Sequence, residues 1–288
     1  MKKLICFILF VLLLCGCTPE NEVNIVATTL PVYTFTQRLC EGTGLKIEQL
    51  VTENVSCLHD YTLKVSQMQL LEQADAVVIS GAGLEDFLED ALDITSSTID
   101  ASAGLTLLEG AHEEHDHHDG HTHEEDPHIW LSPENAAVMA QNICDSLCDL
   151  YPIHEPTFEA NLAVLISDLD ALQAYGEESL KELSSRELIT FHDGFSYLAE
   201  SFDLTILMAV EEESGSEASV KQLISLVNIV KEHNLPAIFT ETNGSVSAAG
   251  IIAAETNIPI YTLDMGISGE DYFDVMYRNI DTLQEALN

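Results

Sequence analysis

The sequence predicts an α/β protein built from two parallel-sheet domains that a long rigid helix joins. Three observations support this prediction: short apolar runs alternate with helical patterns in both halves, a long helical pattern separates the halves, and 46% of the 288 residues are hydrophobic. Strand–helix alternation is typical of parallel sheets covered by helices. A chain of this length has room for two domains of ordinary size.

Seven apolar runs are predicted to be buried strands, because they are short, rich in β-branched residues and bounded by polar residues or glycine. They are Val23–Thr29, Lys46–Val51, Ala74–Ser80, Leu188–Phe191, Leu204–Val210, Ala237–Thr240 and Ile260–Leu263. Helical patterns occur at Pro31–Cys40, Val65–Gln73, Pro133–Leu150, Gly194–Ser201, Ser219–Asn234, Ser247–Thr256 and Tyr272–Leu287. We therefore expect residues 23–153 and 185–288 to form two α/β domains.

Residues 154–184 are predicted to form the connecting helix. Pro156 fits the first turn of a helix. Apolar residues then recur with helical spacing at Phe158, Leu162, Leu165, Leu169 and Leu172. A helix from Pro156 to Leu183 would be roughly 40 Å long, which suits a rigid connector between two domains. A bent helical hairpin is the alternative, because Gly176 could interrupt the helix.

The N-terminus resembles the signal peptide of a bacterial lipoprotein. Two lysines precede the apolar stretch Leu4–Leu14, which is too short to span a bilayer. The string Leu14-Cys15-Gly16-Cys17 then matches a lipobox, so we expect residues 1–16 to be removed, Cys17 to carry a lipid and residues 17–22 to form a linker. The chain would be anchored at the cell membrane on its extracytoplasmic face, either outside a Gram-positive membrane or in a periplasm. An ordinary signal peptide with incidental cysteines is the alternative.

The charge balance excludes nucleic acid as a partner. Ten Lys and Arg residues stand against 49 Asp and Glu residues, which gives a formal net charge of −39. Such a chain cannot neutralise a row of phosphates. A negative field concentrates cations near the surface, although an acidity that only confers solubility explains the charge equally well.

Four cysteines follow the expected lipid site. Cys144 and Cys148 lie four residues apart in a predicted helix, where two cysteines bridge poorly. We therefore expect both to be small residues of the core. A disulfide between Cys40 and Cys57 is permitted by export but not required, so this pairing stays open.

An acidic, histidine-rich segment covers residues 109–126. It contains His112, His115, His117, His118, His121 and His123. Because it has almost no apolar residues, we predict a solvated, mobile loop without fixed ligand geometry. Such a loop suits weak, multiple capture of metal ions, buffering or sensing. A merely solvated loop is the alternative.

Other candidate ligands lie where predicted strands end. His192, Glu241 and Asp264 each directly follow a strand, His59 lies a few residues after another, and His128 precedes a helix. Ligands of α/β proteins collect at the carboxyl ends of strands, so three histidines and one carboxylate could converge between the domains. This ligand set suits Zn²⁺ or another borderline transition metal better than Ca²⁺ or Mg²⁺. Taken singly, each histidine could instead be a hydrogen-bonded structural residue.

Several strings, in their order and spacing, resemble one protein family. They are Thr28-Thr29-Leu30-Pro31-Val32-Tyr33, His59-Asp60-Tyr61, Ala74-Asp75-Ala76-Val77-Val78, Gly81-Ala82-Gly83-Leu84-Glu85, Asp126-Pro127-His128-Ile129-Trp130-Leu131, Phe191-His192-Asp193-Gly194-Phe195-Ser196-Tyr197 and Leu263-Asp264. Over essentially the whole mature chain, the sequence is similar to the zinc and manganese solute-binding proteins of bacterial ABC transporters, the solute-binding protein 9 family. The resemblance implies two α/β domains joined by a long helix, with the metal in the cleft between them.

The resemblance also implies the metal ligands. Carried over position by position, they are His59, His128, His192 and Asp264. Glu241 is expected to support the site without binding the metal. In this family a histidine at the third position accompanies zinc and a glutamate accompanies manganese. His192 therefore favours Zn²⁺, in agreement with the metal preference of imidazole, and Mn²⁺ or mixed specificity is the alternative.

Four places depart from the family's usual residues. Ser132 replaces an aspartate, Phe87 a tryptophan, Met265 a proline, and Thr242-Asn243 a Pro-Gln-like pair. None of them is an implied ligand, but Met265 could alter the approach of Asp264.

We therefore expect an extracytoplasmic, monomeric protein that captures Zn²⁺ and delivers it to a membrane permease driven by an ATPase. Both partners would be separate chains, because the sequence has no Walker motif and its mature part has no transmembrane segment. A zinc hydrolase is the rival hypothesis, in which His59, His128 and His192 hold zinc and a water while Glu241 acts as base. The sequence contains no HExxH motif and no nucleophile elbow, so we expect no enzyme activity.

Overall fold

The computed structural model describes residues 23–53, 55, 58, 61–92, 95, 97–110, 125–211, 219–242, 244, 246–269 and 271–288. Some of the expectations above concern residues outside these ranges. They are the signal segment and linker, the lipid site Cys17, the possible disulfide partner Cys57, the ligand His59 and the six histidines His112, His115, His117, His118, His121 and His123.

The first sheet has four parallel strands in the order β2-β1-β3-β4. These are β1 (Ile25–Ala27), β2 (Ile47–Gln49), β3 (Ala76–Ile79) and β4 (Thr98–Asp100). The first three fall inside predicted runs, whereas β4 was not predicted. It is a three-residue edge strand in which only Ile99 is buried, so it lacks the apolar run by which the other strands were recognised.

The second sheet repeats this arrangement with the order β6-β5-β7-β8, again all parallel. Its strands are β5 (Glu187–His192), β6 (Thr205–Glu211), β7 (Ile238–Glu241) and β8 (Ile260–Leu263). In both sheets the strand that comes first along the chain pairs with the second and the third. The expected α/β fold with two parallel sheets is confirmed.

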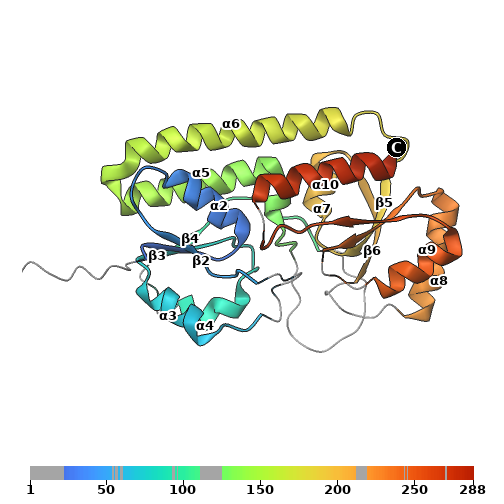
Figure 1. Ribbon diagram of the computed structural model, residues 1–288, viewed down its shortest axis with the longest axis horizontal. Coiled ribbons are helices and arrows are strands. Elements are labelled where there is room, and N and C mark those ends of the chain that lie inside the picture. Colours follow the sequence, from blue (N-terminus) through green and yellow to red (C-terminus); the bar gives the residue numbers. More distant parts are fainter. Residues whose placement is uncertain are drawn as a thin grey trace, which may run out of the picture.

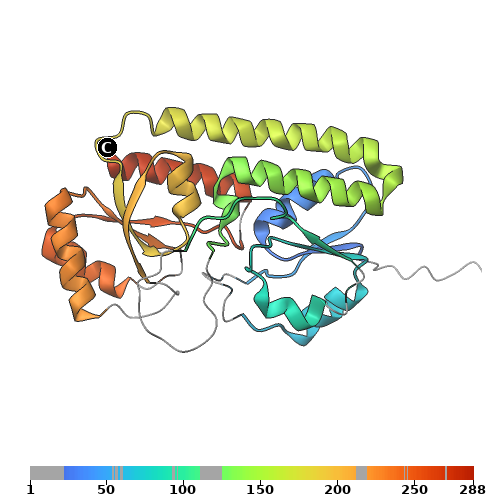
Figure 2. The ribbon, with the colours of Figure 1, turned by 180° about the vertical axis from the view of Figure 1, so that it is seen from behind.

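Helices cover both faces of the first sheet (Figures 1 and 2). On one face lie α2 (Leu30–Leu39) and α5 (Pro133–Leu150), and on the other lie α3 (Val65–Gln73) and α4 (Glu89–Leu92). Alternate residues of the central strands therefore enter different cores, because side chains of a strand point to opposite faces. Ile25 packs in the core under α2 and α5, while its neighbour Val26 packs with Leu71 and Leu88 in the other.

The second sheet is covered in the same way. Its helices are α7 (Ser196–Ser201), α8 (Val220–His233), α9 (Ser247–Thr256) and α10 (Tyr272–Leu287). Helices α8 and α9 pack together on one side of the sheet, and α10 lies on the other beside α6 (Figure 1). The largest buried core is continuous from α2 and α5 to α10, so it joins the two halves of the molecule.

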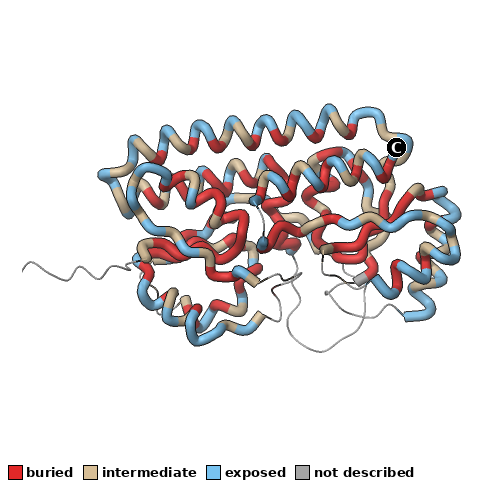
Figure 3. The backbone as a smooth tube through the Cα atoms, viewed as in Figure 1, coloured by how far each residue is buried: buried red, intermediate tan, exposed pale blue. Residues whose placement is uncertain are grey.

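Helix α6 (Glu155–Ser179) spans both sheets along one side of the molecule (Figure 1). Its 25 residues are unbroken, so the alternative of a bent hairpin is wrong. The buried stripe visible in Figure 3 consists of Phe158, Leu162, Leu165, Leu169, Leu172 and Gly176. This stripe packs on α2, α5 and α10. No helix within the described residues is long and apolar enough to serve as a membrane span.

Candidate metal centre

His192 and Glu241 lie side by side at the carboxyl edge of the second sheet. His192 is the last residue of β5 and Glu241 the last residue of β7, and these two strands pair. Their side chains are 1% and 4% exposed, and His192 Nδ1 lies 3.9 Å from Glu241 Oε2. Both strands run one residue further than the sequence predicted. The expected position at the strand ends is therefore correct to within one residue.

The short segment before α5 fixes the position of His128. The carboxylate of Asp126 accepts a hydrogen bond from the His128 backbone N–H at 2.9 Å, and its Oδ1 lies 2.8 Å from His128 Nδ1. Ile129, Trp130 and Leu131 follow as a fully buried 3₁₀ turn. The imidazole is thus held on one side by a carboxylate and on the other by an apolar anchor.

The Asp126 contact determines which nitrogen of His128 can bind a metal. An ionised carboxylate only accepts hydrogen bonds. Opposite such a carboxylate, the Nδ1 atom of His128 carries the ring proton and donates a hydrogen bond to Asp126. The neutral ring then has its lone pair on Nε2. A carboxylate that orients a histidine in this way is the common arrangement behind metal-binding imidazoles.

The Nε2 atoms of His128 and His192 face each other at 3.5 Å. The two rings are nearly perpendicular, with an interplanar angle of 86°, and both residues are at least 98% buried. Two imidazole ligands of a tetrahedral zinc ion, each about 2.0–2.1 Å from the metal, have their nitrogens about 3.3 Å apart. The observed separation therefore fits one metal ion held by both rings.

Asp264 is held by its own loop. Its backbone N–H donates to Asn279 Oδ1 at 2.9 Å, and its carbonyl accepts from Asn279 Nδ2 at 2.7 Å. Its carboxylate Oδ1 accepts from the Gly266 N–H at 2.8 Å. The residue is half-buried, and these bonds leave Oδ2 as the oxygen that could bind a metal.

The structure thus brings some of the candidate residues together and not others. Within the described ranges, no group of three or more His, Cys, Asp or Glu side chains lies close enough to hold a metal ion. His128 and His192 form the closest pair. Glu241 and Asp126 face the Nδ1 atoms of these two histidines. Asp264 lies in the loop that follows β8. His59 falls outside the described residues.

Hydrogen bonds from the C-terminal half hold the His128 segment. Tyr197 Oη donates to the Asp126 carbonyl at 2.9 Å, and Tyr272 Oη donates to the Trp130 carbonyl at 2.8 Å. In return, Trp130 Nε1 donates to the Met265 carbonyl at 2.7 Å. The imidazole pair therefore lies where the two halves of the molecule are fastened together.

The histidine-rich segment begins and ends close to this pair. Glu109 and Glu125 form an isolated antiparallel bridge, and the Asp126 N–H donates to the Leu108 carbonyl at 2.8 Å. These contacts hold residues 108 and 109 beside residues 125 and 126, and Asp126 lies two residues before His128.

Asp126 was not predicted as the partner of His128, and Gly194 was not predicted to lie beside both imidazoles. Met265 was expected to alter the approach of Asp264, but its place beside the two imidazoles was not predicted. A carboxylate two residues before a histidine is a local signal that could have identified Asp126, because Asp side chains often accept from the backbone two residues on. The contacts of Gly194 and Met265 join distant parts of the chain and have no such signal.

A buried carboxylate lies at the corresponding edge of the first sheet. Glu85 accepts hydrogen bonds from the hydroxyl of Thr28 at 2.6 Å and from the N–H groups of Ser80 and Gly81 at 2.7 and 3.0 Å. These bonds tie together the chain segments that leave β1 and β3. Burial raises the pKa of Glu85 to about 7, although the hydrogen bonds act in the opposite direction.

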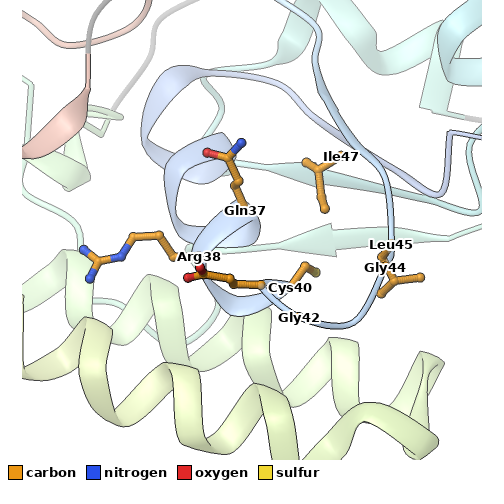
Figure 4. A pocket seen from close by; sticks show the side chains of 8 residues that line it. Gln37, Arg38, Cys40, Gly42, Gly44, Leu45 and Ile47 are labelled. Atoms are coloured by element: carbon orange, nitrogen blue, oxygen red, sulfur yellow. The ribbon is translucent and has the colours of Figure 1, made fainter.

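A separate cavity of about 550 Å³ lies at the opposite end of the first sheet, where α2 leads into β2 (Figure 4). It is lined by Gln37, Arg38, Cys40, Glu41, Gly42, Gly44, Leu45 and Ile47. No histidine is among these residues. Cys40 is a free thiol whose burial raises its pKa to about 12, so it is not a ready metal ligand. Cys144 and Cys148 are also free, and Cys144 is buried as expected.

Comparison with known proteins identifies a family over most of the chain. Residues 25–286 match the family described as "ZnuA: Zinc-uptake complex component A periplasmic". The zinc-binding lipoprotein AdcA of Streptococcus pneumoniae serotype 4 is 31% identical over 283 residues, which cover 93% of this chain and 56% of AdcA. A putative metal-binding protein of Treponema pallidum is 27% identical, with 93% of this chain and 88% of that protein covered. The chain thus spans little more than half the length of AdcA.

Two solved structures are similar over nearly the whole chain. A crystal structure of ZnuA has a TM-score of 0.82 and 28% identity, covering 93% of this chain and all of that one. The Zn(II)-bound ZnuA-like domain of Streptococcus pneumoniae AdcA has a TM-score of 0.77 and 29% identity, covering 93% of this chain and 99% of that one.

Proposed function

Because the chain belongs to the ZnuA family of zinc-uptake components, we propose that it binds Zn²⁺ outside the cytoplasm and delivers it to an ABC transporter. The observation that carries this proposal is the buried pair of imidazole nitrogens, 3.5 Å apart, at the junction of the two halves. For this delivery we propose a membrane permease and an ATPase as separate partners, in keeping with a family described as one component of a zinc-uptake complex.

We propose His59, His128, His192 and Asp264 as the zinc ligands. The first two would come from the N-terminal half and the last two from the C-terminal half, so the ion would join both. Glu241 acts through His192: its carboxylate faces Nδ1, the nitrogen turned away from His128. Such a partner orients an imidazole and raises its basicity.

Zinc is a better fit than manganese for this ligand set. Imidazole ligands suit Zn²⁺, whereas Mn²⁺ favours sites rich in oxygen. Three histidines with one carboxylate complete the tetrahedral shell of zinc. Manganese remains the second candidate, with Asp264 as its single oxygen ligand from the protein.

The position of Glu241 favours binding over hydrolysis. A general base must reach the water on the metal, which would lie on the Nε2 side of His192. The Glu241 carboxylate lies on the Nδ1 side. We therefore propose a binding protein and not a zinc hydrolase.

The anchor and the domain limits belong to the same proposal. A lipid on Cys17, after loss of residues 1–16, would hold the protein at the extracytoplasmic face of the cell membrane, with residues 17–22 as linker. The two domains would comprise residues 23–153 and 185–288, joined by residues 154–184, and the protein would act as a monomer. The AdcA lipoproteins among its relatives support such an anchor.

Metal analysis of two histidine variants tests the proposed function. Chelator-stripped wild-type protein reloaded with Zn²⁺ should retain one tightly held equivalent, and His192→Ala should lose it. His233→Ala is the matched control, because His233 lies in the same half but pairs with Glu187 at the surface. Full retention of the equivalent by His192→Ala would show that the ligand assignment is wrong.

We also propose an accessory role for the histidine-rich segment. The described residues on either side of the six histidines support this role, because Glu109 pairs with Glu125, which lies three residues before His128. Deleting residues 112–123 should remove additional, weaker zinc equivalents and keep the tight one. Loss of the tight equivalent would mean that the segment supplies a ligand to the primary site.

A further inference from the structure

Gly194 marks a point at which three side chains of the site converge. A Cβ atom built on Gly194 would lie 2.6 Å from Met265 Cε, 2.8 Å from His192 Cδ2 and 2.9 Å from His128 Cε1. These side chains come from three separate segments: the loop after β8, the end of β5 and the turn before α5. The backbone of Gly194 is not left-handed, so the position calls for a small residue because room is scarce.

The two imidazoles present their metal-binding edges to this point. In imidazole, Cδ2 and Cε1 are the two carbons bonded to Nε2. The atoms nearest to Gly194 are therefore neighbours of the nitrogens that face each other at 3.5 Å. The terminal methyl group of Met265 borders the same space.

Met265 is held firmly in this position. Its side chain is 3% exposed. Its carbonyl accepts the hydrogen bond from Trp130 Nε1 at 2.7 Å, and the next residue, Gly266, has a positive φ of 65° and binds the Asp264 carboxylate. The backbone of Met265 is thereby fixed, and its buried methyl group forms part of the wall beside the two histidines.

We propose that Met265, with Gly194 making room for it, determines metal selectivity by limiting the number of ligands. The inference rests on the proposed function, because it assumes that His128 and His192 bind the transported ion. An apolar methyl group offers no hydrogen bond to water, and a water placed against it loses part of its bonding. Extra water ligands are thereby excluded from that side of the ion.

This exclusion acts differently on the two candidate metals. Zn²⁺ is stable with four ligands and has no geometric preference from its d electrons. Mn²⁺ favours six ligands, mainly oxygen, and here it would need waters to complete its shell. A closed apolar wall therefore disfavours Mn²⁺ relative to Zn²⁺ without contributing any bond to either.

Competitive binding of Zn²⁺ and Mn²⁺ to three purified variants tests the inference. In Met265→Ala the wall opens, so the ratio of zinc to manganese affinity should fall about tenfold, the effect of one added water interaction. Met265→Leu keeps an apolar side chain of similar size and should keep the wild-type ratio. Met139→Ala, which removes a buried methionine of α5, controls for the effect of a cavity elsewhere.

Cobalt(II) provides a spectroscopic readout that does not depend on affinity. Four-coordinate Co²⁺ absorbs visible light far more strongly than six-coordinate Co²⁺. The absorption should stay strong in the wild type, Met265→Leu and Met139→Ala, and should weaken in Met265→Ala. An unchanged spectrum and an unchanged affinity ratio in Met265→Ala would overturn the inference.

A second result would also overturn it. If Met265→Leu behaves like Met265→Ala, the sulfur atom itself is a ligand and packing is not the cause. Failure of the proposed function gives a different pattern, because the wild-type protein would then hold no stoichiometric zinc and His192→Ala would not differ from it.

Discussion

At the scale of single residues, Asp126 determines how His128 can act. Its Oδ1 atom accepts hydrogen bonds from both the backbone N–H and the Nδ1–H of His128. Its other oxygen, Oδ2, is buried without a hydrogen-bond partner in the described part of the chain. A buried carboxylate with an unused oxygen is costly unless a positive charge lies near. A cation on the opposite nitrogen of the ring would provide such a charge.

We predict that Asp126→Ala lowers zinc affinity by about 10- to 100-fold, the usual effect of removing such an orienting partner. The ring would lose the contact that fixes its tautomer and its direction. Asp126→Asn is the control, since its amide oxygen can still accept from Nδ1 and should preserve part of the affinity. Competition with a chromophoric chelator measures both. Equal affinity of wild type and Asp126→Ala would exclude this role.

Glu85 predicts a pH dependence of stability in the metal-free protein. Its pKa is about 7 in the folded state and about 4.5 in the unfolded chain, so the folded state binds the proton more tightly. The contribution of Glu85 to the free energy of unfolding is fully present below pH 4.5. It is lost as the pH rises through 7, and the total loss is roughly 3 kcal/mol. Glu85→Gln should remove this slope.

Urea unfolding at several pH values between 4 and 8 gives the difference in the free energy of unfolding between wild type and Glu85→Gln. Only the change of that difference with pH tests the raised pKa, because glutamine has one acceptor oxygen fewer than glutamate at every pH. The exposed Glu89, four residues further on, provides the control variant Glu89→Gln. A difference that does not change with pH would contradict the raised pKa.

The sequence was sufficient to find the residues that end strands, but not those that fill the space between them. His192 and Glu241 follow from β-branched runs and from the rule that ligands collect at strand ends. Met265 and Gly194 meet through segments about 70 residues apart, and nothing in their local pattern indicates the contact. The same rule selects Asp264, which follows β8, and the resemblance adds its role as a ligand, which is a proposal.

At the scale of elements, packing explains why Gly176 does not break α6. Gly176 lies near the end of the helix, on the buried stripe. A Cβ built there would lie 2.2 Å from Phe202 Cε1 and 2.4 Å from Phe202 Cζ. The glycine therefore lets the ring of Phe202 contact the helix backbone, and this contact anchors α6 on the C-terminal half.

We predict that Gly176→Ala destabilises the protein by about 1–3 kcal/mol, the usual cost of overpacking a core. Gly250→Ala is the matched control in α9, where a Cβ would meet nothing within 4 Å. It should stabilise the protein by about 0.5–1 kcal/mol, because alanine is the better helix former. Thermal unfolding separates the two signs. A stabilising Gly176→Ala would show that the ring moves freely.

Four of the helices with nine or more residues were predicted with correct limits, whereas the four-residue helix α4 was not predicted. The limits of α3, α5, α9 and α10 agree with the predicted ranges, because each presents a sustained apolar face or clear end signals. Helix α4 has four residues and begins with two acidic ones, Glu89 and Asp90. Its position depends on the packing of Leu88 and Ala91 in the core and not on a helical pattern.

At the scale of the whole molecule, the two halves are fastened together around the histidine pair. The Leu30 N–H donates to the Ile267 carbonyl at 2.8 Å, and Trp130 exchanges hydrogen bonds with Met265 and Tyr272. Each of these bonds joins the N-terminal half to the loop after β8 or to α10. A metal held by ligands from both halves would add to the same set of contacts.

Zinc should therefore stabilise the protein as one unit. A ligand that binds only the folded state adds about 2.7 kcal/mol when its concentration is 100 times its Kd. For a chain of this size we expect the Tm to rise by about 5–10 °C.

Trp130 is the only tryptophan and is fully buried beside the site, so its fluorescence reports unfolding. His233→Ala should show the same shift and His192→Ala none. A zinc-dependent shift that survives in His192→Ala would place the stabilising ion elsewhere, and an equal shift with Mn²⁺ would contradict the proposed preference for zinc.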